Sequence, residues 1–389
     1  MNKDKIPFWR DSRLLKLFFQ AILIVILLLL LLFFSQNLIH NFQQLGLSFG
    51  FGFIFDNDLN SRFNIGDSPI SYKPTDPYSR AILVGLLNSL RVMISGIILT
   101  FILGVTLGLG RLSNNWLVRK ISTIYVEIIR NTPLLLQLFF WYFAVFLKLP
   151  KIDNPLIIKN SIFLSNQGIY IPFPLGNFQT LLAIFALIFS SILAVIIWRK
   201  QTQVIIQQGR TDNLYNRYLI IIVTLSILLI IFGLDWQFPG YDSQIQRIQG
   251  GLNFSPEFAT LLMGLTIYTA AFIAEIVRAG IQSVSQGQWE AAKSLGLNSG
   301  LVMRLVIFPQ ALRVMIPPLT SEFLNLAKNS SLAVAIGYND VYAVSNTISN
   351  QTGKSIEMLL VVMASYLVFN LIISSGMNWL NRSVQIKEK

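Results

Sequence analysis

Long apolar stretches recur along the whole sequence, and they constrain the fold more than any other feature. Eight of them approach or exceed the roughly 20 residues that a helix needs to cross the hydrocarbon core of a bilayer. The mean hydropathy is +0.60 and only 12% of the residues are charged, unlike a soluble domain. The sequence therefore predicts an all-α, polytopic membrane helix bundle with about eight transmembrane helices. The stretches are 16–34, 82–109, 121–147, 180–198, 218–234, 258–283, 304–327 and 356–380.

The first apolar stretch follows a basic N-terminal segment, as a secretory signal peptide also does. It is too long for the apolar core of a signal peptide, and no small-residue cleavage site follows it. We therefore expect a retained anchor helix. Residues 1–80 are expected to form a cytoplasmic tail, this anchor and an external loop.

Basic residues gather in alternate loops, and this pattern explains the net charge of +12. With a cytoplasmic N-terminus, the positive-inside rule predicts that every second loop carries the basic residues. The opposite loop 35–81 balances its three basic residues with four aspartates. The charge thus indicates orientation in a lipid bilayer, with both termini cytoplasmic, and no nucleic-acid partner is expected. The basic residues on the predicted cytoplasmic side are Lys3, Lys5, Arg10, Arg13, Lys16, Arg111, Arg119, Lys120, Arg199, Lys200, Arg210, Arg217, Lys293, Arg304, Arg382, Lys387 and Lys389.

Two further loops, 148–179 and 235–257, are rich in Pro, Gly, Asn and aromatic residues. They are expected to form ordered external caps on two helices. The main domain is expected over 81–380, and a short cytoplasmic tail over 381–389.

The third apolar stretch contains Glu127 and Arg130, which lie three residues apart and so share a helix face. Charges at membrane depth are costly and indicate function by default. Pro133 lacks the N–H that would bond Ile129, and it disfavours helical geometry at Thr132. The helix is expected to kink or break there. Broken helices at such depth usually line a cavity.

The sixth stretch repeats this pattern with Glu275 and Arg278. Two E-x-x-R pairs at similar depth predict cross-pairing, Glu127 with Arg278 and Arg130 with Glu275. Two interpretations stay open at this point. The four charges form a buried ion network that holds the bundle together, or they form a site for a zwitterion, which needs a cation for its carboxylate and an anion or carbonyl oxygens for its ammonium. The two interpretations can both hold.

The seventh stretch contains Glu322, Asn325 and Lys328 at three-residue spacing, and such a polar stripe is expected to face the bundle interior or a water-filled path. A second kink is expected at Pro317 and Pro318.

The second stretch contains Arg91, an intramembrane charge that stands alone in the sequence. It also contains Gly96, Gly104 and Gly108, and small residues of this kind let two helices approach closely.

The sequence contains no recognisable pattern of catalytic or metal-binding residues. There are no cysteines, and the single histidine, His40, lies in a polar flank outside the spans. The segment Gly353-Lys354-Ser355 lacks the upstream glycine of a phosphate-binding loop. We expect no enzyme activity, no catalytic residue, no metal and no cofactor on this chain.

A polar segment, GQWEAAKSLGLNSGLVMRLVIFP at 287–309, interrupts the last apolar stretches. It resembles the signature loop of permease subunits of ATP-binding-cassette importers: E-A-A, three residues, G, nine residues, then I-x-L-P. Gly296 and Pro309 fall in register, while Val306 and Phe308 replace the isoleucine and leucine.

Flanking segments narrow the resemblance. RNTPLLLQLFF, TAAFIAEIVRAGIQSVSQGQWEAAKSLGL and FLNLAKNSSL resemble the polar amino-acid branch, the permeases for histidine, glutamine, arginine and general L-amino acids. The resemblance covers about 80–380, interrupted by 148–257, which adds two helices to the usual type I importer core. This insertion and the anchor are similar to the longer permease of general L-amino-acid importers, which pairs with a different permease. Arg91 departs from the apolar residue expected there.

The resemblance implies a division of labour among several proteins. Two permeases form the pathway in the cytoplasmic membrane, an external binding protein delivers an L-amino acid, and a dimer of ATPases that hold ATP-Mg drives transport. Within the cytoplasmic loop 284–303, the expected coupling helix contacts the ATPase. Glu290 is expected to favour the helix N-terminus and Gly296 to end the helix. The expected contact residues are Gly287, Glu290, Ala291, Ala292, Ser294, Leu295 and Gly296.

The expected pathway residues are Glu127, Arg130, Thr132, Glu275, Arg278, Glu322 and Asn325. Two other classes of function compete with an importer permease. An ion-coupled secondary amino-acid carrier would use intramembrane carboxylates without an ATPase. A membrane-embedded enzyme would need catalytic groups that the sequence lacks.

Overall fold

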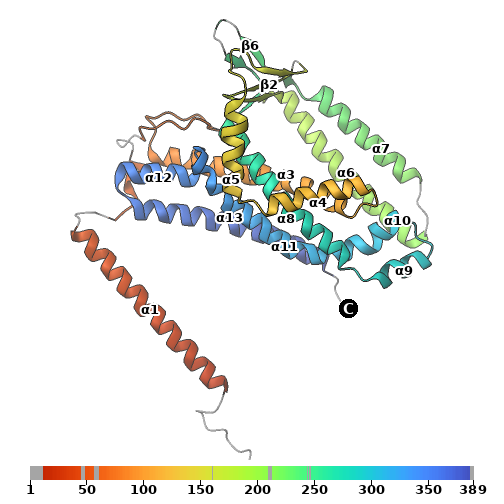
Figure 1. The fold of residues 1–389 in the computed structure, drawn as a ribbon, viewed down its shortest axis with the longest axis horizontal. Helices are drawn as coiled ribbons and strands as arrows, with labels where there is room; N and C mark the ends of the chain where they lie inside the picture. The colour runs from red at the N-terminus through yellow and green to blue at the C-terminus, as the bar shows by residue number, and fades with distance from the viewer. Residues whose placement is uncertain are drawn as a thin grey trace, which may run out of the picture.

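The computed structural model describes residues 12–44, 49–56, 61–159, 161–208, 213–242, 244 and 247–385. Among these, seven helices are long and apolar enough to cross a membrane, or eight if one bent helix pair counts as one span. The eight predicted stretches all lie on these helices, so the membrane bundle is confirmed (Figure 1). Several predicted cytoplasmic basic residues (Lys3, Lys5, Arg10, Arg210, Lys387 and Lys389) lie outside the described residues.

The bent pair is α4 (Trp116–Arg130) and α5 (Leu134–Phe139), the latter continued by η1 (Phe140–Val145) and η2 (Phe146–Lys148). Its two halves meet at 104°, which confirms the break expected at Pro133. The carbonyls freed there find side-chain donors. The Gln137 Nε2 donates to the carbonyl oxygens of Ile129 and Thr132, at 3.1 Å each. The break therefore leaves these groups satisfied without water, as a bilayer requires.

The centre of the bundle is the contact between α3 (Tyr78–Arg111) and α8 (Pro256–Gln282), which run parallel. Glycines on α3 make it possible, as predicted. A Cβ added to Gly104 would lie 2.6 Å from the Ile273 Cβ, and one added to Gly108 would lie 2.7 Å from the Val277 Cβ. No larger residue fits these positions without moving a helix.

After α8 the chain turns through the short helix α9 (Gln286–Ser294), α10 (Ser299–Leu301) and the π-helical η4 (Val302–Ile307) into α11 (Phe308–Asn329). The helix α11 continues through Pro317 and Pro318, so the second kink, which was expected there, does not end the helix. The 3-10 segment η5 (Ser330–Ile336), α12 (Val341–Thr352) and α13 (Ser355–Val384) complete the core.

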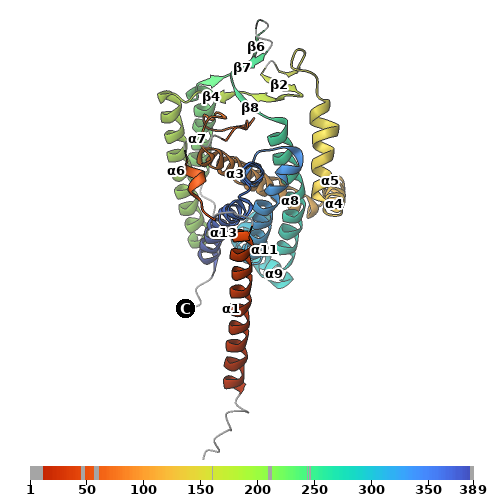
Figure 2. The same ribbon diagram turned by 90° about the vertical axis from the view of Figure 1, so that its left-hand side faces the viewer.

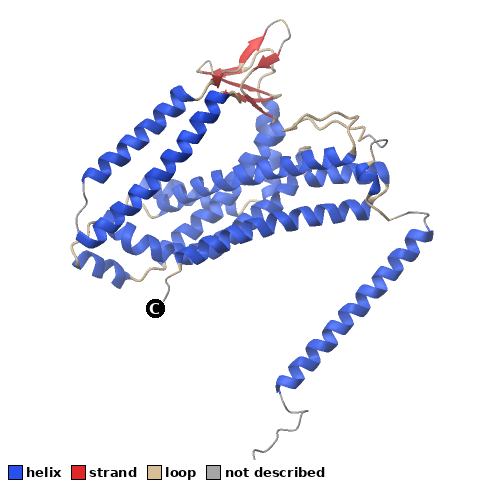
Figure 3. Ribbon diagram, turned by 180° about the vertical axis from the view of Figure 1, so that it is seen from behind, coloured by secondary structure: helices blue, strands red, loops and turns tan. Residues whose placement is uncertain are grey.

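Two inserted helices, α6 (Phe178–Gln208) and α7 (Asn213–Leu228, continued by η3, Leu229–Gly233), diverge from this core in Figure 1. Their flanking loops join in one small antiparallel β-cap, which the all-α prediction did not include (Figure 3). Its four-stranded sheet has the order β1-β2-β3-β8, and β8 comes from the far side of the insertion. The strands are β1 (Leu156–Ile158), β2 (Ile162–Ser165), β3 (Gly168–Ile171), β4 (Phe173–Pro174), β5 (Trp236–Gln237), β6 (Gly240–Asp242), β7 (Arg247–Gln249) and β8 (Leu252–Phe254).

The anchor helix α1 (Ser12–Gln44) projects away from the rest of the molecule in both Figure 1 and Figure 2. No residue in its apolar window is buried. The loop that follows, which was expected to be external, is partly folded. Its short helix α2 (Gly52–Phe55) and residues such as Ile65 pack on α12 and on the first turns of α3 and α13.

The glycine contact leads to a first prediction. The substitution Gly104→Ala places a Cβ against Ile273, and overpacking of this kind costs about 1–3 kcal/mol. We expect a lower unfolding temperature of the purified protein in detergent. Gly376→Ala, at an open position on α13, is the matched control and leaves that temperature unchanged or raises it. Equal unfolding temperatures for the two variants would contradict the close packing of α3 on α8.

Candidate functional site

The short helix α9 ends as a glycine-capped helix does. Gly296 has φ of +76°, a left-handed conformation that glycine adopts without strain. The Gly296 N–H donates to the Lys293 carbonyl at 2.9 Å, and the Leu297 N–H donates to the Ala292 carbonyl at 3.3 Å. This is the Schellman arrangement. The expected helix stop at Gly296 is thus present in the structure.

One side of α9 packs against the protein and the other side is free. Ala292 is 3% exposed and, with Trp289 and Leu297, packs on the core formed by α8, η4 and α11. The other residues expected to contact an ATPase (Gly287, Glu290, Ala291, Ser294, Leu295 and Gly296) are exposed. Leu295 is 80% exposed, which is unusual for a large apolar side chain in a polar loop. Ala292 therefore anchors the helix to the core.

Glu290 does not lie where the sequence suggested. The helix begins at Gln286, and its first turn contains no acidic residue. Glu290 instead accepts a hydrogen bond from the Gln286 Nε2 at 3.1 Å. Its carboxylate is therefore exposed in the middle of the helix and not placed to stabilise the N-terminal turn.

The segment after α9 is tied to the inserted helix α6, a contact that the sequence did not indicate. The Arg304 guanidinium lies 4.7 Å from the ring centre of Trp198 and donates to the Thr202 Oγ1 at 2.6 Å. The sequence gives one signal for this contact: Trp198 and Thr202 are about one helical turn apart and so share a face of α6.

On α4, Glu127 and Arg130 are exposed, and Thr132 is half-buried. No ion pair joins Glu127 or Arg130 to another described residue. The Arg130 guanidinium lies 5.2 Å from the ring centre of Phe272 on α8. The Thr132 Oγ1 donates to the Ile128 carbonyl at 2.8 Å, at the end of α4. The helix thus presents two charges in its C-terminal half that form no ion pair with a described residue.

Glu275 lies in an ion cluster at the far end of the α3 and α8 contact. It pairs with Arg278 on its own helix and with Arg111, the last residue of α3. Arg278 also donates to the Gln282 Oε1 at 2.6 Å. The predicted cross-pairing of Glu275 with Arg130 and of Glu127 with Arg278 is therefore wrong. Arg111 takes the position beside Glu275 because the parallel packing of α3 carries it there.

On α11, Glu322 is half-buried, while Asn325 and Lys328 are exposed. Glu322 is close enough to Arg130 for the two opposite charges to attract each other, but they form no ion pair. Glu322 therefore lies on the side of α11 that faces the charged end of α4.

Arg91 is not alone, in contrast to the interpretation of the sequence. Its Nη1 and Nη2 donate to the two carboxylate oxygens of Asp67 at 3.1 and 2.6 Å. The guanidinium also lies 3.9 Å from the ring centre of Phe258. Asp67 lies in the loop before α3, so this pair ties the loop to α3. In the same loop, burial raises the pKa of Tyr72, whose hydroxyl donates to the Phe63 carbonyl at 3.0 Å.

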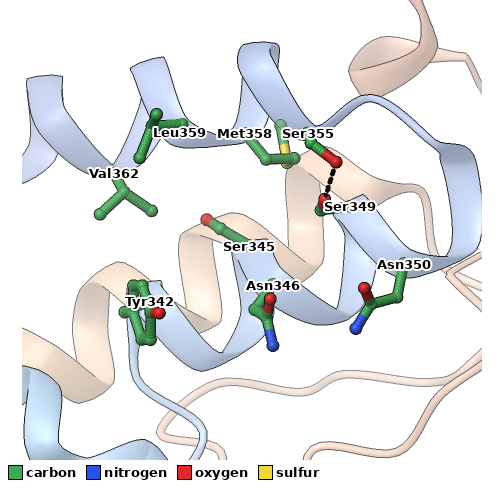
Figure 4. A pocket seen from close by; sticks show the side chains of 9 residues that line it. All are labelled: Tyr342, Ser345, Asn346, Ser349, Asn350, Ser355, Met358, Leu359 and Val362. Atoms are coloured by element: carbon green, nitrogen blue, oxygen red, sulfur yellow. Dashed lines mark hydrogen bonds between the residues drawn. The ribbon is translucent and has the colours of Figure 1, made fainter.

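A polar groove between α12 and α13 was missed by the sequence analysis (Figure 4). Its cavity of about 310 Å³ is lined on the α12 side by Ser345, Asn346, Ser349 and Asn350. The Ser345 Oγ is buried and has no hydrogen-bond partner among the described residues. The signal that could have revealed this face is the pair of polar dipeptides, four residues apart, in VSNTISN.

Among the described residues, no cluster of three or more His, Cys, Asp or Glu side chains is placed to hold a metal ion.

Comparison with known proteins gives a consistent result. Residues 204–386 match the family of binding-protein-dependent transport system inner membrane components. A putative amino-acid ABC transporter permease, YhdX of Escherichia coli, is 44% identical over 91% of this chain and 90% of its own length. The general L-amino acid transport system permease AapQ of Rhizobium johnstonii is 39% identical, over 97% and 94%. A glutamate/glutamine/aspartate/asparagine transport system permease, BztB of Rhodobacter capsulatus, is 36% identical, over 97% and 96%.

Among solved structures, an amino acid ABC transporter with histidines is 22% identical and has a TM-score of 0.47. The match covers 79% of this chain and 95% of the chain in the solved structure. The relatives match this chain over nearly its whole length, including the insertion and the anchor. The chain belongs to the family of inner-membrane permease components of amino-acid ABC transporters, and it is a multi-pass membrane protein.

Proposed function

We propose that this chain is one of two permease subunits of an importer that moves L-amino acids across the cytoplasmic membrane. ATP-Mg is held and hydrolysed on separate ATPase subunits, and an external binding protein delivers the substrate. The observation that carries the proposal is α9, a glycine-capped helix anchored by buried Ala292, with Leu295 and Gly296 exposed at its tip. An exposed leucine on a rigidly held helix end is suited to a groove on a partner protein.

The coupling loop in this proposal spans 284–303. The ATPase contact is made by Gly287, Glu290, Ala291, Ser294, Leu295 and Gly296, with Ala292 as the internal anchor. The side that carries α9 is cytoplasmic. Its loops are the basic ones, and an even number of spans puts both termini on that side.

A second permease covers the charged end of α4. Glu127 and Arg130 are exposed, and an exposed charge at membrane depth does not face lipid at low cost. A protein neighbour or a water-filled path between two permeases removes this cost. We propose a different permease as this neighbour, since the insertion and anchor resemble those of the longer member of a mixed pair.

The pathway runs along the same face. Arg130 provides a cation for the substrate carboxylate, and Glu322, half-buried on α11 beside Asn325, provides an anion for its ammonium. Thr132 and Glu127 lie at the adjoining helix break. The ion cluster of Glu275, Arg278 and Arg111 is internally paired, so its role in this proposal is to hold α3 and α8 together near the coupling loop.

The coupling helix gives the second prediction. Gly296→Asp adds a side chain and a charge at the exposed tip of α9, and it strains the left-handed backbone. We expect loss of ATPase co-purification and of uptake, while the chain still inserts into membranes. Deletion of 288–298 has the same expected result.

Gly353→Asp is the matched control for this experiment. Gly353 also has a left-handed φ, of +70°, with open space around its Cβ, but it ends α12 far from α9. It should retain the ATPase. Normal co-purification of ATPase with the Gly296→Asp variant would contradict the coupling-helix proposal. Uptake that continues without any ATPase would instead indicate an ion-coupled carrier.

The pathway gives the third prediction. Arg130→Ala removes the cation proposed for the substrate carboxylate, and we expect uptake to fall about tenfold or more with ATPase association intact, because a charge-assisted contact is lost. Glu275→Gln is expected to impair uptake as well, since it leaves Arg111 beside Arg278 without the anion between them.

Arg119→Ala serves as the control for both variants, because Arg119 is an exposed arginine in the first turns of the same α4. Uptake kinetics are measured with saturating binding protein. Unchanged kinetics in Arg130→Ala would contradict the proposed substrate contact, and unchanged kinetics in Glu275→Gln would show that transport does not depend on the ion cluster.

A further inference from the structure

A polar cavity of about 430 Å³ lies on the external side, where four separate segments meet. The external loop contributes Asp67, and the turn between β2 and β3 contributes Asn166 and Gln167. The start of α8 contributes Ser255 and Glu257, and the turn between η5 and α12 contributes Asn339. We call this the external cavity. None of its other lining residues is basic.

The floor of the external cavity is held rigidly by one buried residue. Asn88, 0% exposed, donates from its Nδ2 to the Asp67 carbonyl at 2.7 Å and to the Asn339 carbonyl at 2.9 Å. The Ser255 Oγ donates to the Asp67 Oδ2 at 3.0 Å. These bonds join the external loop, α3, α8 and the turn before α12. The cavity is therefore a built feature of the core and not a gap between mobile loops.

The charges around the external cavity do not balance. Asp67 is neutralised by Arg91, so it contributes acceptor atoms but no net charge. Glu257 accepts a hydrogen bond from the Tyr142 hydroxyl at 2.8 Å, and no ion pair joins it to another described residue. It lies in the first turn of α8, where the helix dipole favours a negative charge. The cavity thus carries one uncompensated anion.

The hydrogen-bonding groups of the external cavity also favour a positively charged ligand. The Asn166 Oδ1 is buried without a hydrogen-bond partner among the described residues. A carboxylate and several side-chain amides lining one cavity suit a ligand that donates several hydrogen bonds and carries a positive charge. A primary ammonium has three N–H donors and one positive charge. The amide groups of Gln167, Asn253 and Asn339 remain available for a carboxylate or carboxamide on the same ligand.

We propose that the external cavity is a binding site for a primary ammonium group, with Glu257 as its counter-ion. The ammonium is supplied by a free amino acid before it enters the membrane, or by a lysine side chain of the external binding protein. The proposal rests on the proposed function, since only an importer presents either ligand at this surface.

The test uses the reconstituted complex with its ATPase and follows hydrogen–deuterium exchange in peptides that cover 253–257 and 337–339. L-glutamine is the probe, because its carboxamide matches the amide-rich lining. N-acetyl-L-glutamine keeps the carboxamide and carboxylate but has no ammonium. We expect L-glutamine to slow exchange in both peptides and N-acetyl-L-glutamine to have no effect. This ligand pair requires no variant and so does not depend on how a mutant folds.

Variants then assign the counter-ion. Glu257→Gln should raise the L-glutamine concentration for half-maximal protection at least about tenfold. Asp153→Asn removes an exposed external carboxylate away from the cavity and should behave as the unmodified protein. If L-glutamine protects neither peptide but the binding protein does, and if lysine acetylation and Glu257→Gln each abolish that protection, the ammonium comes from a lysine.

Equal protection by the two glutamine compounds, equal protection in Glu257→Gln, or no protection by either source would overturn the site. Uptake by the same preparation separates this failure from that of the proposed function. Normal uptake without protection rejects only the cavity, whereas absent uptake in the unmodified complex rejects the importer itself.

Discussion

The parallel contact of α3 with α8 is the interaction on which the rest of the structure depends. Gly104 and Gly108 let the two backbones approach, and the register that results fixes both ends of the pair. At the C-terminal end of the pair it brings Arg111 to Glu275, directly before the turn that leads into α9. At the N-terminal end it places Arg91 over the ring of Phe258. One steric condition thus positions both α9, the helix that we propose for coupling, and the floor of the cavity that we propose for an ammonium group.

The sequence predicted what depends on neighbours along the chain. The spans follow from runs of apolar residues, the break at Pro133 from a missing N–H, and the end of α9 from Gly296. It did not predict partners that tertiary packing selects. Glu275 pairs with a residue 164 positions away, and β3 pairs with β8 across the whole inserted hairpin. A periodic pattern indicates which face of a helix is polar, but it does not indicate which other helix that face meets.

The insertion joins the two sides of the protein. At one end the β-cap ends in β8, which leads through Ser255 into α8. At the other end α6 is held by Arg304, which follows α9 and α10. Between these ends most large apolar residues of α6 and α7 are exposed, as suits contact with lipid or with a neighbouring subunit. The inserted hairpin therefore connects the β-cap to the segment after α9 without passing through the core.

The charged residues that hold the fold together are paired within the chain, whereas those that we propose for transport are not. The charges that hold α3 and α8 in place are neutralised within the chain, Arg91 by Asp67 and Glu275 by Arg111 and Arg278. Among the described residues, Glu127, Arg130 and Glu257 have no ionic partner. A membrane protein that leaves a charge unpaired bears its desolvation cost unless another molecule completes the pair. These three charges lie on the face that we propose for the second permease and the substrate, and in the cavity that we propose for an ammonium group. The unpaired charges are therefore the common basis of both proposals.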